Sequence, residues 1–142
     1  MPRVILDTNV IVSAFLKPES NPALILSLFL EGYLTVCLCE EIWTEYREVL
    51  KRRKFQKLDH ESIDKFFSII KEKALWAVPR ASVEILKSDP ADNKFLACAL
   101  EAKADYLITG NTRHFLFKKF HGTRIIIPKD FIELIGHDIY EK

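Results

Sequence analysis

The stretch DPADNKFLACALEAKADYLITG, residues 89–110, sets the fold class. Asp89 and Pro90 are typical of a helix start, and apolar residues recur at helical spacing after them. Residues 106–109 form a short run of strand-forming side chains that ends at Gly110. A helix that leads directly into a short apolar strand is half of a βαβ unit, from which parallel sheets are built.

The same alternation continues through the rest of the chain. We expect further strands over residues 4–6, 34–38, 75–78 and 125–127. We expect further helices over residues 10–17, 21–31, 42–50, 59–74 and 112–120. No internal repeat, low-complexity tract or linker interrupts this pattern in the sequence. We therefore predict one α/β domain over residues 1–142, with a parallel sheet covered on both faces.

Composition excludes several classes of protein. A length of 142 residues suits one domain. A hydrophobic content of 49% with ten Phe is enough for a core, which excludes a mainly disordered chain. The longest apolar stretch, residues 24–30, is far shorter than the roughly 18 residues of a membrane span. Asp7 interrupts the first apolar run, so we expect no leader peptide.

The cysteines indicate a reducing compartment. There are three of them, and Cys37 and Cys39 do not form a CxxC pair. On an extended segment these two side chains point to the same face, as buried thiols do. We therefore expect a cytoplasmic protein with free thiols.

Charge is balanced overall but uneven along the chain. The 21 basic and 20 acidic residues give a net charge of +1, which says nothing about nucleic acid. One segment, the basic run, is opposed by Glu48 alone; it consists of Arg47, Lys51, Arg52, Arg53, Lys54 and Lys57. A polyanionic partner explains this run, and so does a solvated helix end.

Polar residues follow two of the expected strands. Asp7 ends the strand of residues 4–6, and Asn111 comes soon after the strand of residues 106–109. Both are expected at the carboxyl edge of the sheet, where open α/β folds bind ligands. Asp105 lies at the start of its strand and should be at the opposite edge.

Two further acids lie on expected helices. Asp92 shares a helix face with Phe95 and Leu96, so its carboxylate should face the core. Glu45 flanks the apolar stripe of its own helix. Each acid also has a simpler explanation: Asp7 as a helix cap, Asp92 as a first-turn residue favoured by the helix dipole, and Glu45 as a surface acid.

Other catalytic patterns are missing from the sequence. The four His have no zinc-ligand spacing, and the four Gly form neither GxGxxG nor a P-loop. No Gly-x-Ser-x-Gly elbow occurs either. A site of carboxylate oxygens for a hard cation is what remains, and such a site is best suited to Mg²⁺ or Mn²⁺.

Three segments resemble motifs of the PIN domain family: Leu6-Asp7-Thr8-Asn9-Val10 with Ser13 after it, residues 89–97, and residues 104–110. Their order and spacing also match, and Glu45 falls on the helix where the family carries its second acid. The resemblance extends over residues 3–135. The chain is most similar to bacterial and archaeal PIN proteins described as toxins of toxin–antitoxin pairs.

The resemblance implies a three-layer α/β/α sandwich and a ribonuclease that depends on Mg²⁺ or Mn²⁺. Asp7, Glu45 and Asp92 match the family's first three acids, which hold the metal. Asn111 stands where the family has its fourth acid. Its amide oxygen is able to ligate but brings no charge, so a second metal would bind more weakly.

Further roles and partners follow from this resemblance. Three side chains would orient the carboxylates through hydrogen bonds: Thr8, Asn9 and Thr109. Part of the basic run would hold the RNA backbone, namely Arg47, Arg52 and Arg53. The expected partners are RNA, an antitoxin protein and a second copy of the chain, with no membrane association.

Three functions fit these observations. A PIN ribonuclease that acts as a toxin accounts for all of the motifs. A PIN fold that is weak or inactive in catalysis, and binds RNA or a protein partner, accounts for Asn111. A Mg²⁺-dependent phosphoacceptor of the response-regulator kind also clusters acids at a sheet edge. It needs a phosphorylatable Asp at the end of a middle strand, however, and the sequence offers no good candidate.

Overall fold

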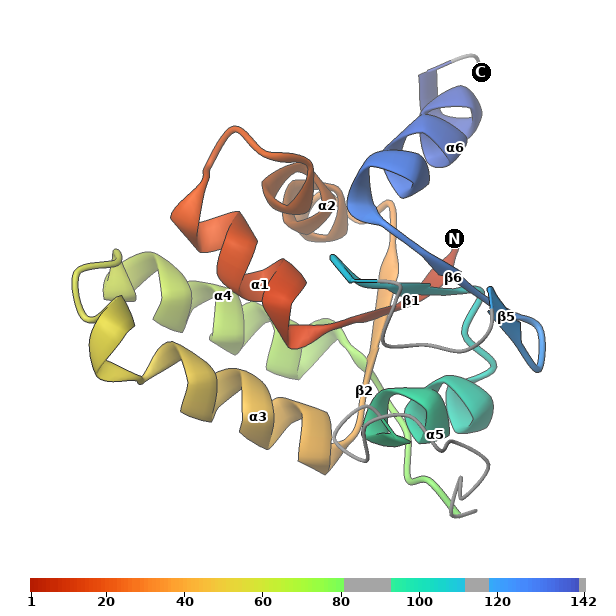
Figure 1. The fold of residues 1–142 in the computed structure, drawn as a ribbon, viewed down its shortest axis with the longest axis horizontal. Coiled ribbons are helices and arrows are strands. Elements are labelled where there is room, and N and C mark those ends of the chain that lie inside the picture. Colours follow the sequence, from red (N-terminus) through yellow and green to blue (C-terminus); the bar gives the residue numbers. More distant parts are fainter. Residues whose placement is uncertain (81–92, 112–117, 141–142) are drawn as a thin grey trace.

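The computed structural model describes residues 1–80, 93–111 and 118–140 (Figure 1). Its strands are β1 (Arg3–Leu6), β2 (Thr35–Leu38), β3 (Leu75–Trp76), β4 (Tyr106–Ile108), β5 (Lys119–Phe120) and β6 (Thr123–Ile126). In the described part of the chain they form one six-stranded sheet in the order β3-β2-β1-β4-β6-β5. Neighbouring strands are parallel except for β5, which is antiparallel to β6. The expected mostly parallel sheet is confirmed.

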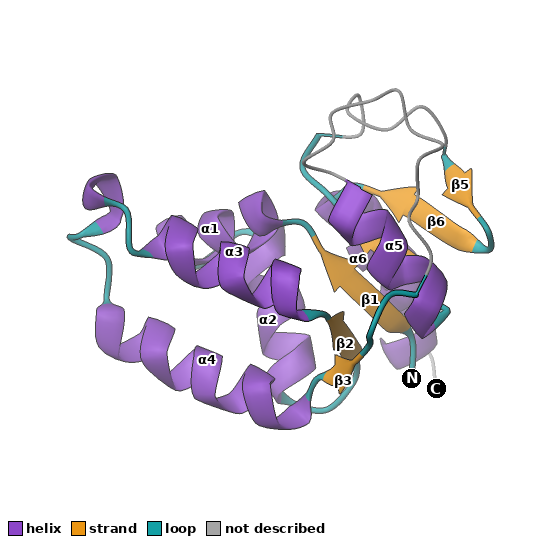
Figure 2. Cartoon of the chain, turned by 90° about the horizontal axis from the view of Figure 1, so that it is seen from below, coloured by secondary structure: helices purple, strands orange, loops and turns teal. Residues whose placement is uncertain are grey.

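Helices cover both faces of the sheet. They are α1 (Thr8–Leu16), α2 (Asn21–Leu30), α3 (Glu40–Leu50), α4 (His60–Lys73), α5 (Asn93–Ala102) and α6 (Pro128–Tyr140), with a short 3₁₀ helix, η1 (Arg53–Phe55), after α3. Helices α1, α2 and α6 lie on one side of the sheet, and α3, α4 and α5 lie on the other (Figure 1). Figure 2 shows α3 and α4 side by side. The expected three-layer α/β/α sandwich is confirmed.

The register of the sheet brings the ends of β1 and β4 together. Leu6, the last residue of β1, pairs with Ile108, the last residue of β4. The residues that follow these strands therefore meet at one edge, where an open α/β sheet binds its ligands. Asp105 lies at the other edge, as expected, and its carboxylate accepts a hydrogen bond from the Arg3 N–H at 2.8 Å.

Local sequence signals explain where several helices begin. Ser20 caps α2 by accepting a hydrogen bond from the Ala23 N–H at 3.3 Å, and a proline occupies the first turn. Asp59 caps α4 in the same way through the Ser62 N–H at 3.2 Å. The start of α5 expected at Asp89 lies outside the described residues.

The core lies between the sheet and the two helical layers. The side chains of β1 are fully buried at Val4, Ile5 and Leu6. All three cysteines are buried free thiols, as expected for Cys37 and Cys39. Among the described residues, none of the helices combines the length and the apolar character needed to cross a membrane.

The expected helix over residues 112–120 is wrong in its last part. Lys119–Phe120 forms β5, while residues 112–117 lie outside the described residues. His121 and Gly122 both have positive φ, 46° and 89°, which is the backbone of a tight hairpin turn. This turn folds β6 back against β5.

The last helix is an element that the sequence pattern does not predict. Pro128 directly follows the predicted strand of residues 125–127, and the structure begins α6 there. Proline suits this position because the first helical turn needs no N–H and its φ is already helical. Phe131 and Ile135, one turn apart, are buried and anchor α6 to the core.

Candidate functional site

The candidate site begins at Asp7, the residue that follows β1. Its backbone N–H donates to the Ile108 carbonyl at 2.9 Å, so strand pairing continues one residue beyond β1. Only 7% of the Asp7 surface is exposed. Asp7 occupies the cap position of α1, yet its side chain makes no capping hydrogen bond. The interpretation of this carboxylate as a helix cap therefore lacks the capping hydrogen bond that it expects.

Two neutral side chains donate hydrogen bonds to the Asp7 carboxylate. The hydroxyl of Thr109, which is fully buried, donates to Asp7 Oδ2 at 2.7 Å. The side-chain amide of Asn9 donates to the same oxygen at 3.2 Å. Oδ1 takes part in neither bond. The neighbouring ends of β1 and β4 thus supply the carboxylate and its strongest donor, as the parallel register predicts.

The loop after β4 is tied to this carboxylate through a second layer of hydrogen bonds. The Gly110 N–H donates to Asn9 Oδ1 at 3.2 Å, and the Asn111 N–H donates to Thr109 Oγ1 at 3.1 Å. A Cβ at position 110 would lie 3.4 Å from Asn9 Oδ1, at the edge of ordinary van der Waals contact. The two backbone hydrogen bonds hold the start of the loop beside the site.

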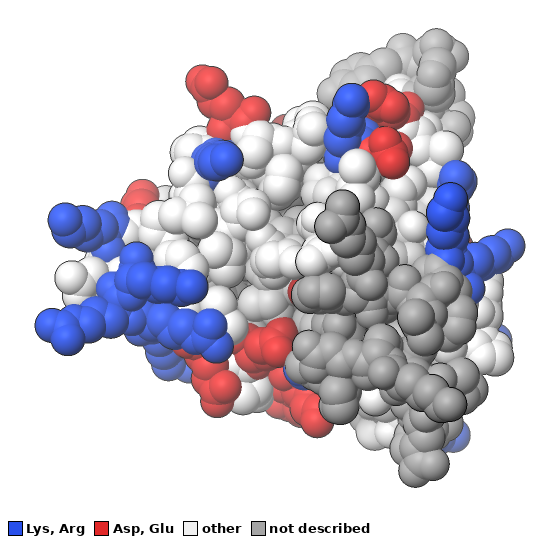
Figure 3. Space-filling view, in the orientation of Figure 1, with Lys and Arg blue, Asp and Glu red and all other residues white. Residues whose placement is uncertain are grey.

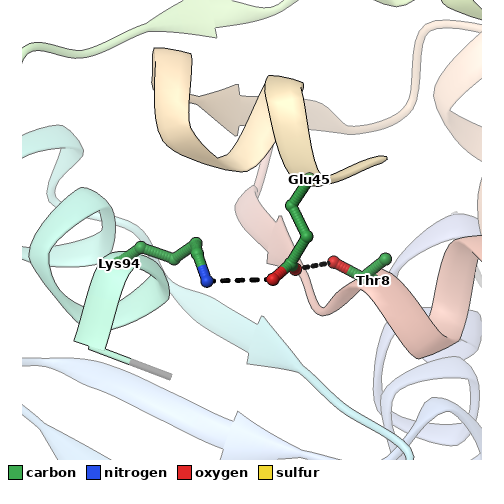
Figure 4. A network of polar contacts seen from close by, with 3 residues as sticks. All are labelled: Thr8, Glu45 and Lys94. Carbon is green, nitrogen blue, oxygen red and sulfur yellow. Dashed lines mark hydrogen bonds and ion pairs between the residues drawn. The ribbon is translucent and has the colours of Figure 1, made fainter. Parts of the chain in front are cut away.

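Glu45 reaches the same place from α3 (Figure 4). Thr8 donates its hydroxyl to Glu45 Oε2, and Lys94 of α5 places Nζ 2.9 Å from Glu45 Oε1. The next residue, Tyr46, is fully buried and donates its hydroxyl to the Leu6 carbonyl at the end of β1. Two hydroxyl groups therefore fix α3 against the segment that carries Asp7.

Burial raises the pKa of the Asp7 carboxyl above its ordinary value. The hydrogen bond from Thr109 lowers this pKa, whereas the negative charge of Glu45 raises it. Burial has the largest effect, because the ionised carboxylate loses its hydration. An approaching cation would offset both the lost hydration and the repulsion between the two carboxylates.

An acidic cavity opens beside Glu45. Its volume is about 400 Å³, and the described residues that line it are Glu40, Glu41, Thr44, Glu45, Glu48 and Lys94. The side-chain oxygen of Asn93, next to Lys94 in the sequence, is buried and accepts no hydrogen bond from the described residues.

The carboxylate oxygens of Asp7 and Glu45 suit a hard divalent cation, because Mg²⁺ and Mn²⁺ prefer oxygen ligands. The described residues alone do not complete such a site. Within them, the His, Cys, Asp and Glu side chains form no group of three able to hold a metal ion. Asp92, the third predicted acid, lies outside the described residues.

The basic run does not surround the two carboxylates. Arg47 packs over the Trp43 ring, with its guanidinium carbon 5.7 Å from the ring centroid. It lines a cavity between α3 and α4, whereas Glu45 lines the acidic one. Arg52 and Arg53 are exposed on the connection that follows α3. In Figure 3 the basic side chains gather at the far end of α3, and acidic side chains gather near its start.

Two site residues lie beyond the set predicted from sequence: Tyr46 and Lys94. Tyr46 belongs to the apolar stripe of its helix, so the sequence pattern predicts a core residue and not the hydrogen bond from its hydroxyl to the Leu6 carbonyl. Lys94 belongs to a segment that matches the resemblance, but spacing alone gives it no role. The contact between Lys94 and Glu45 depends on how α5 packs beside α3.

Comparisons with known proteins agree with the fold and the motifs. A profile of the PIN domain family matches residues 3–113. The uncharacterized protein MJ1680 of Methanocaldococcus jannaschii is 29% identical over 145 residues, which cover 92% of this chain and 90% of that protein. The crystal structure of VapBC2 from Rickettsia felis, bound to a DNA fragment from their promoter, gives a TM-score of 0.57 at 18% identity. That match covers 88% of this chain and 98% of the other. At this level of identity it shows that the two chains share a fold.

Proposed function

Because this chain belongs to the PIN domain family, we propose that it is a metal-dependent ribonuclease that hydrolyses phosphodiester bonds of RNA. We propose further that it acts as the toxin of a toxin–antitoxin pair. The observation that carries the proposal is the buried Asp7 carboxylate at the carboxyl edge of the sheet, with Glu45 held beside its segment. A buried carboxylate that is held by neutral side chains, as Asp7 is, is stabilised when a cation joins it.

The metal in this proposal is Mg²⁺ or Mn²⁺. Asp7 and Glu45 would hold it together with Asp92, whose part rests on the sequence resemblance. Asn111 would add a neutral oxygen ligand. When bound, the cation would offset the carboxylate charge, allow a phosphodiester to approach, and activate water for attack on phosphorus.

The chain's own residues would keep the site in shape. Thr109 and Asn9 orient the Asp7 carboxylate, while Thr8 fixes one oxygen of Glu45. Such supporting hydrogen bonds commonly tune the ligands of a metal site. We assign the RNA backbone to Arg52 and Arg53, which are exposed at the end of α3. Arg47, packed on Trp43, would contribute only at the cavity between α3 and α4.

The toxin assignment rests on the sequence resemblance and on the likeness of the fold to VapBC2. On this basis we propose an antitoxin as the protein partner, a cytoplasmic location, and a homodimer as the assembly. A cognate antitoxin should be encoded next to this chain and should inhibit its ribonuclease activity. A neighbouring gene product that neither binds nor inhibits the purified protein would contradict the toxin assignment.

The alternative function is a PIN module that is weak or inactive in catalysis and binds RNA or a protein partner. The residue that favours this alternative is Asn111, because it brings no negative charge to the fourth position. A protein of this kind would bind single-stranded RNA without shortening it, with or without Mn²⁺.

Cleavage of a labelled single-stranded RNA in Mg²⁺ or Mn²⁺ tests the proposal. Asp7→Asn should abolish cleavage, because it removes a ligand charge with little change in shape. Asp105→Asn is the matched control, since Asp105 lies at the opposite edge, and it should cleave like the wild type. Cleavage that persists in EDTA, or in Asp7→Asn, would contradict the metal-dependent mechanism.

A further inference from the structure

Lys94 is a cation in the acidic part of the site, and the proposed function leaves it without a task. Its Nζ lies 2.9 Å from Glu45 Oε1, and the two side chains are only 16% and 28% exposed. The ammonium also lies 5.5 Å from the centroid of the Phe95 ring. Four glutamates line the adjoining cavity together with Lys94. Lys94 is therefore a partly buried cation surrounded by acidic side chains, and not an exposed surface lysine.

Both oxygens of Glu45 are engaged in this arrangement. Thr8 donates to Oε2, and Lys94 donates to Oε1 (Figure 4). A divalent cation that approaches Glu45 meets an ammonium that is attracted to the same carboxylate. Like charges in one site oppose each other, and partial burial keeps solvent from screening them.

We propose that Lys94 is a positioning residue and a built-in counter-ion of this site, which holds Glu45 in place and weakens the binding of divalent metal. The inference rests on the proposed metal-dependent function and adds a control of metal affinity to it. In the absence of metal, the ammonium limits the repulsion between Glu45 and the other acids. Lys94 then sets the metal concentration at which the site fills.

Binding of Mn²⁺ alone to the purified protein tests this inference without any measurement of cleavage. Free Mn²⁺ is followed by its electron paramagnetic resonance signal, which is lost on binding. Lys94→Met keeps the length of the side chain and removes its charge, so Mn²⁺ should bind at least about tenfold more tightly, the effect of one unit charge a few ångströms away. Lys94→Arg keeps the charge and should bind Mn²⁺ like the wild type.

Lys73→Met is the matched control for loss of a lysine charge, because Lys73 is exposed at the end of α4. It should leave Mn²⁺ affinity unchanged. Equal or weaker Mn²⁺ binding by a folded Lys94→Met protein, checked by circular dichroism, would overturn the inference. If that variant does not fold, Lys94→Gln is measured in its place under the same criterion.

The proposed function fails in a different way from this inference. If the wild type binds no Mn²⁺, or if Asp7→Asn binds it as tightly as the wild type, the proposed metal site is wrong. The proposed role of Lys94 is then wrong as well. If the wild type binds Mn²⁺ and Asp7→Asn weakens binding, the proposed metal site is supported. An unchanged affinity in Lys94→Met then rejects only the counter-ion.

Discussion

The two halves of the candidate site hold their carboxylates in different ways. In the strand half, formed by Asp7, Asn9 and Thr109, a buried carboxylate is bound by a neutral hydroxyl and a neutral amide. In the helix half, formed by Thr8, Glu45 and Lys94, an ammonium binds a less buried carboxylate. The strand half therefore calls for an added cation, whereas the helix half carries one of its own. Matched substitutions in the two halves should therefore have effects on activity, metal dependence and stability that differ in size or in sign.

Removing one hydroxyl from each half should give the largest difference. Thr109→Val removes a donor to Asp7 Oδ2, and the hydroxyl lost also accepts from the Asn111 N–H. Loss of such a supporting hydrogen bond typically lowers activity about 10- to 100-fold. Thr8→Val should lower it less, because Lys94 still holds Glu45. The rate of RNA cleavage at saturating Mn²⁺ measures both effects.

Circular dichroism and thermal unfolding serve as controls for these two variants, since valine replaces threonine with almost the same shape. A Thr8→Val protein that loses as much activity as Thr109→Val would mean that both halves depend equally on their hydroxyl donors. The contrast between a strand half and a helix half would then have no functional meaning.

The strand half could be predicted from the sequence because it depends on strand ends. Asp7 and Thr109 each follow a short apolar run directly, and parallel strands place such residues at one edge. The supporting roles of Thr8 and Asn9 are predicted by the resemblance to the PIN domain family, and Thr8 and Asn9 donate to Glu45 and Asp7 respectively. Their contacts are confirmed, while their catalytic meaning is still a prediction.

The helix half could be predicted only in part. Glu45 and Lys94 are 49 positions apart, and their contact depends on how α3 packs beside α5. No periodicity within either helix contains that information. In the same way, Lys119–Phe120 pairs with β6 because a hairpin turn at His121 and Gly122 overrides local preference. Asp92 lies outside the described residues, so its place in the site is a prediction.

Asn111→Asp would add a negative charge to the strand half and so increase the difference between the two halves. A carboxylate binds Mg²⁺ or Mn²⁺ better than an amide oxygen does, so the metal concentration for half-maximal cleavage should fall several-fold. Titration of metal at one pH and one salt concentration measures this change. The same titration on Lys17→Gln, at the exposed end of α1, controls for a loss of one unit of net charge away from the site.

Two other results of this titration carry information. Unchanged metal dependence in Asn111→Asp would place residue 111 outside the site and break its match with the family's fourth acid. Tighter metal with slower cleavage would instead mean that the amide holds water or substrate, and that an added charge repels the phosphate.

Neutralising Asp7 and neutralising Glu45 should change the stability of the metal-free protein in opposite directions. We expect these changes to be the smallest of the predicted effects. Burial and the charge of Glu45 raise the pKa of Asp7, so its ionised form opposes folding at neutral pH. Asp7→Asn should therefore raise the melting temperature. Glu45→Gln should lower stability by up to about 1 kcal/mol, because it weakens the bond to Lys94.

The pH dependence of the melting temperature identifies the cause of the first change. A raised pKa in the folded state means that folding favours the protonated carboxyl, so wild-type stability falls as pH rises through that pKa. The advantage of Asp7→Asn should then be greatest near neutral pH and shrink as pH falls toward 3.8, the ordinary pKa of Asp. Excess Mn²⁺ should reverse the order at neutral pH, because the ion stabilises only a protein that binds it. Equal destabilisation by Asp7→Asn and Glu45→Gln would mean that Lys94 compensates both carboxylates, and that the two halves form one electrostatic unit.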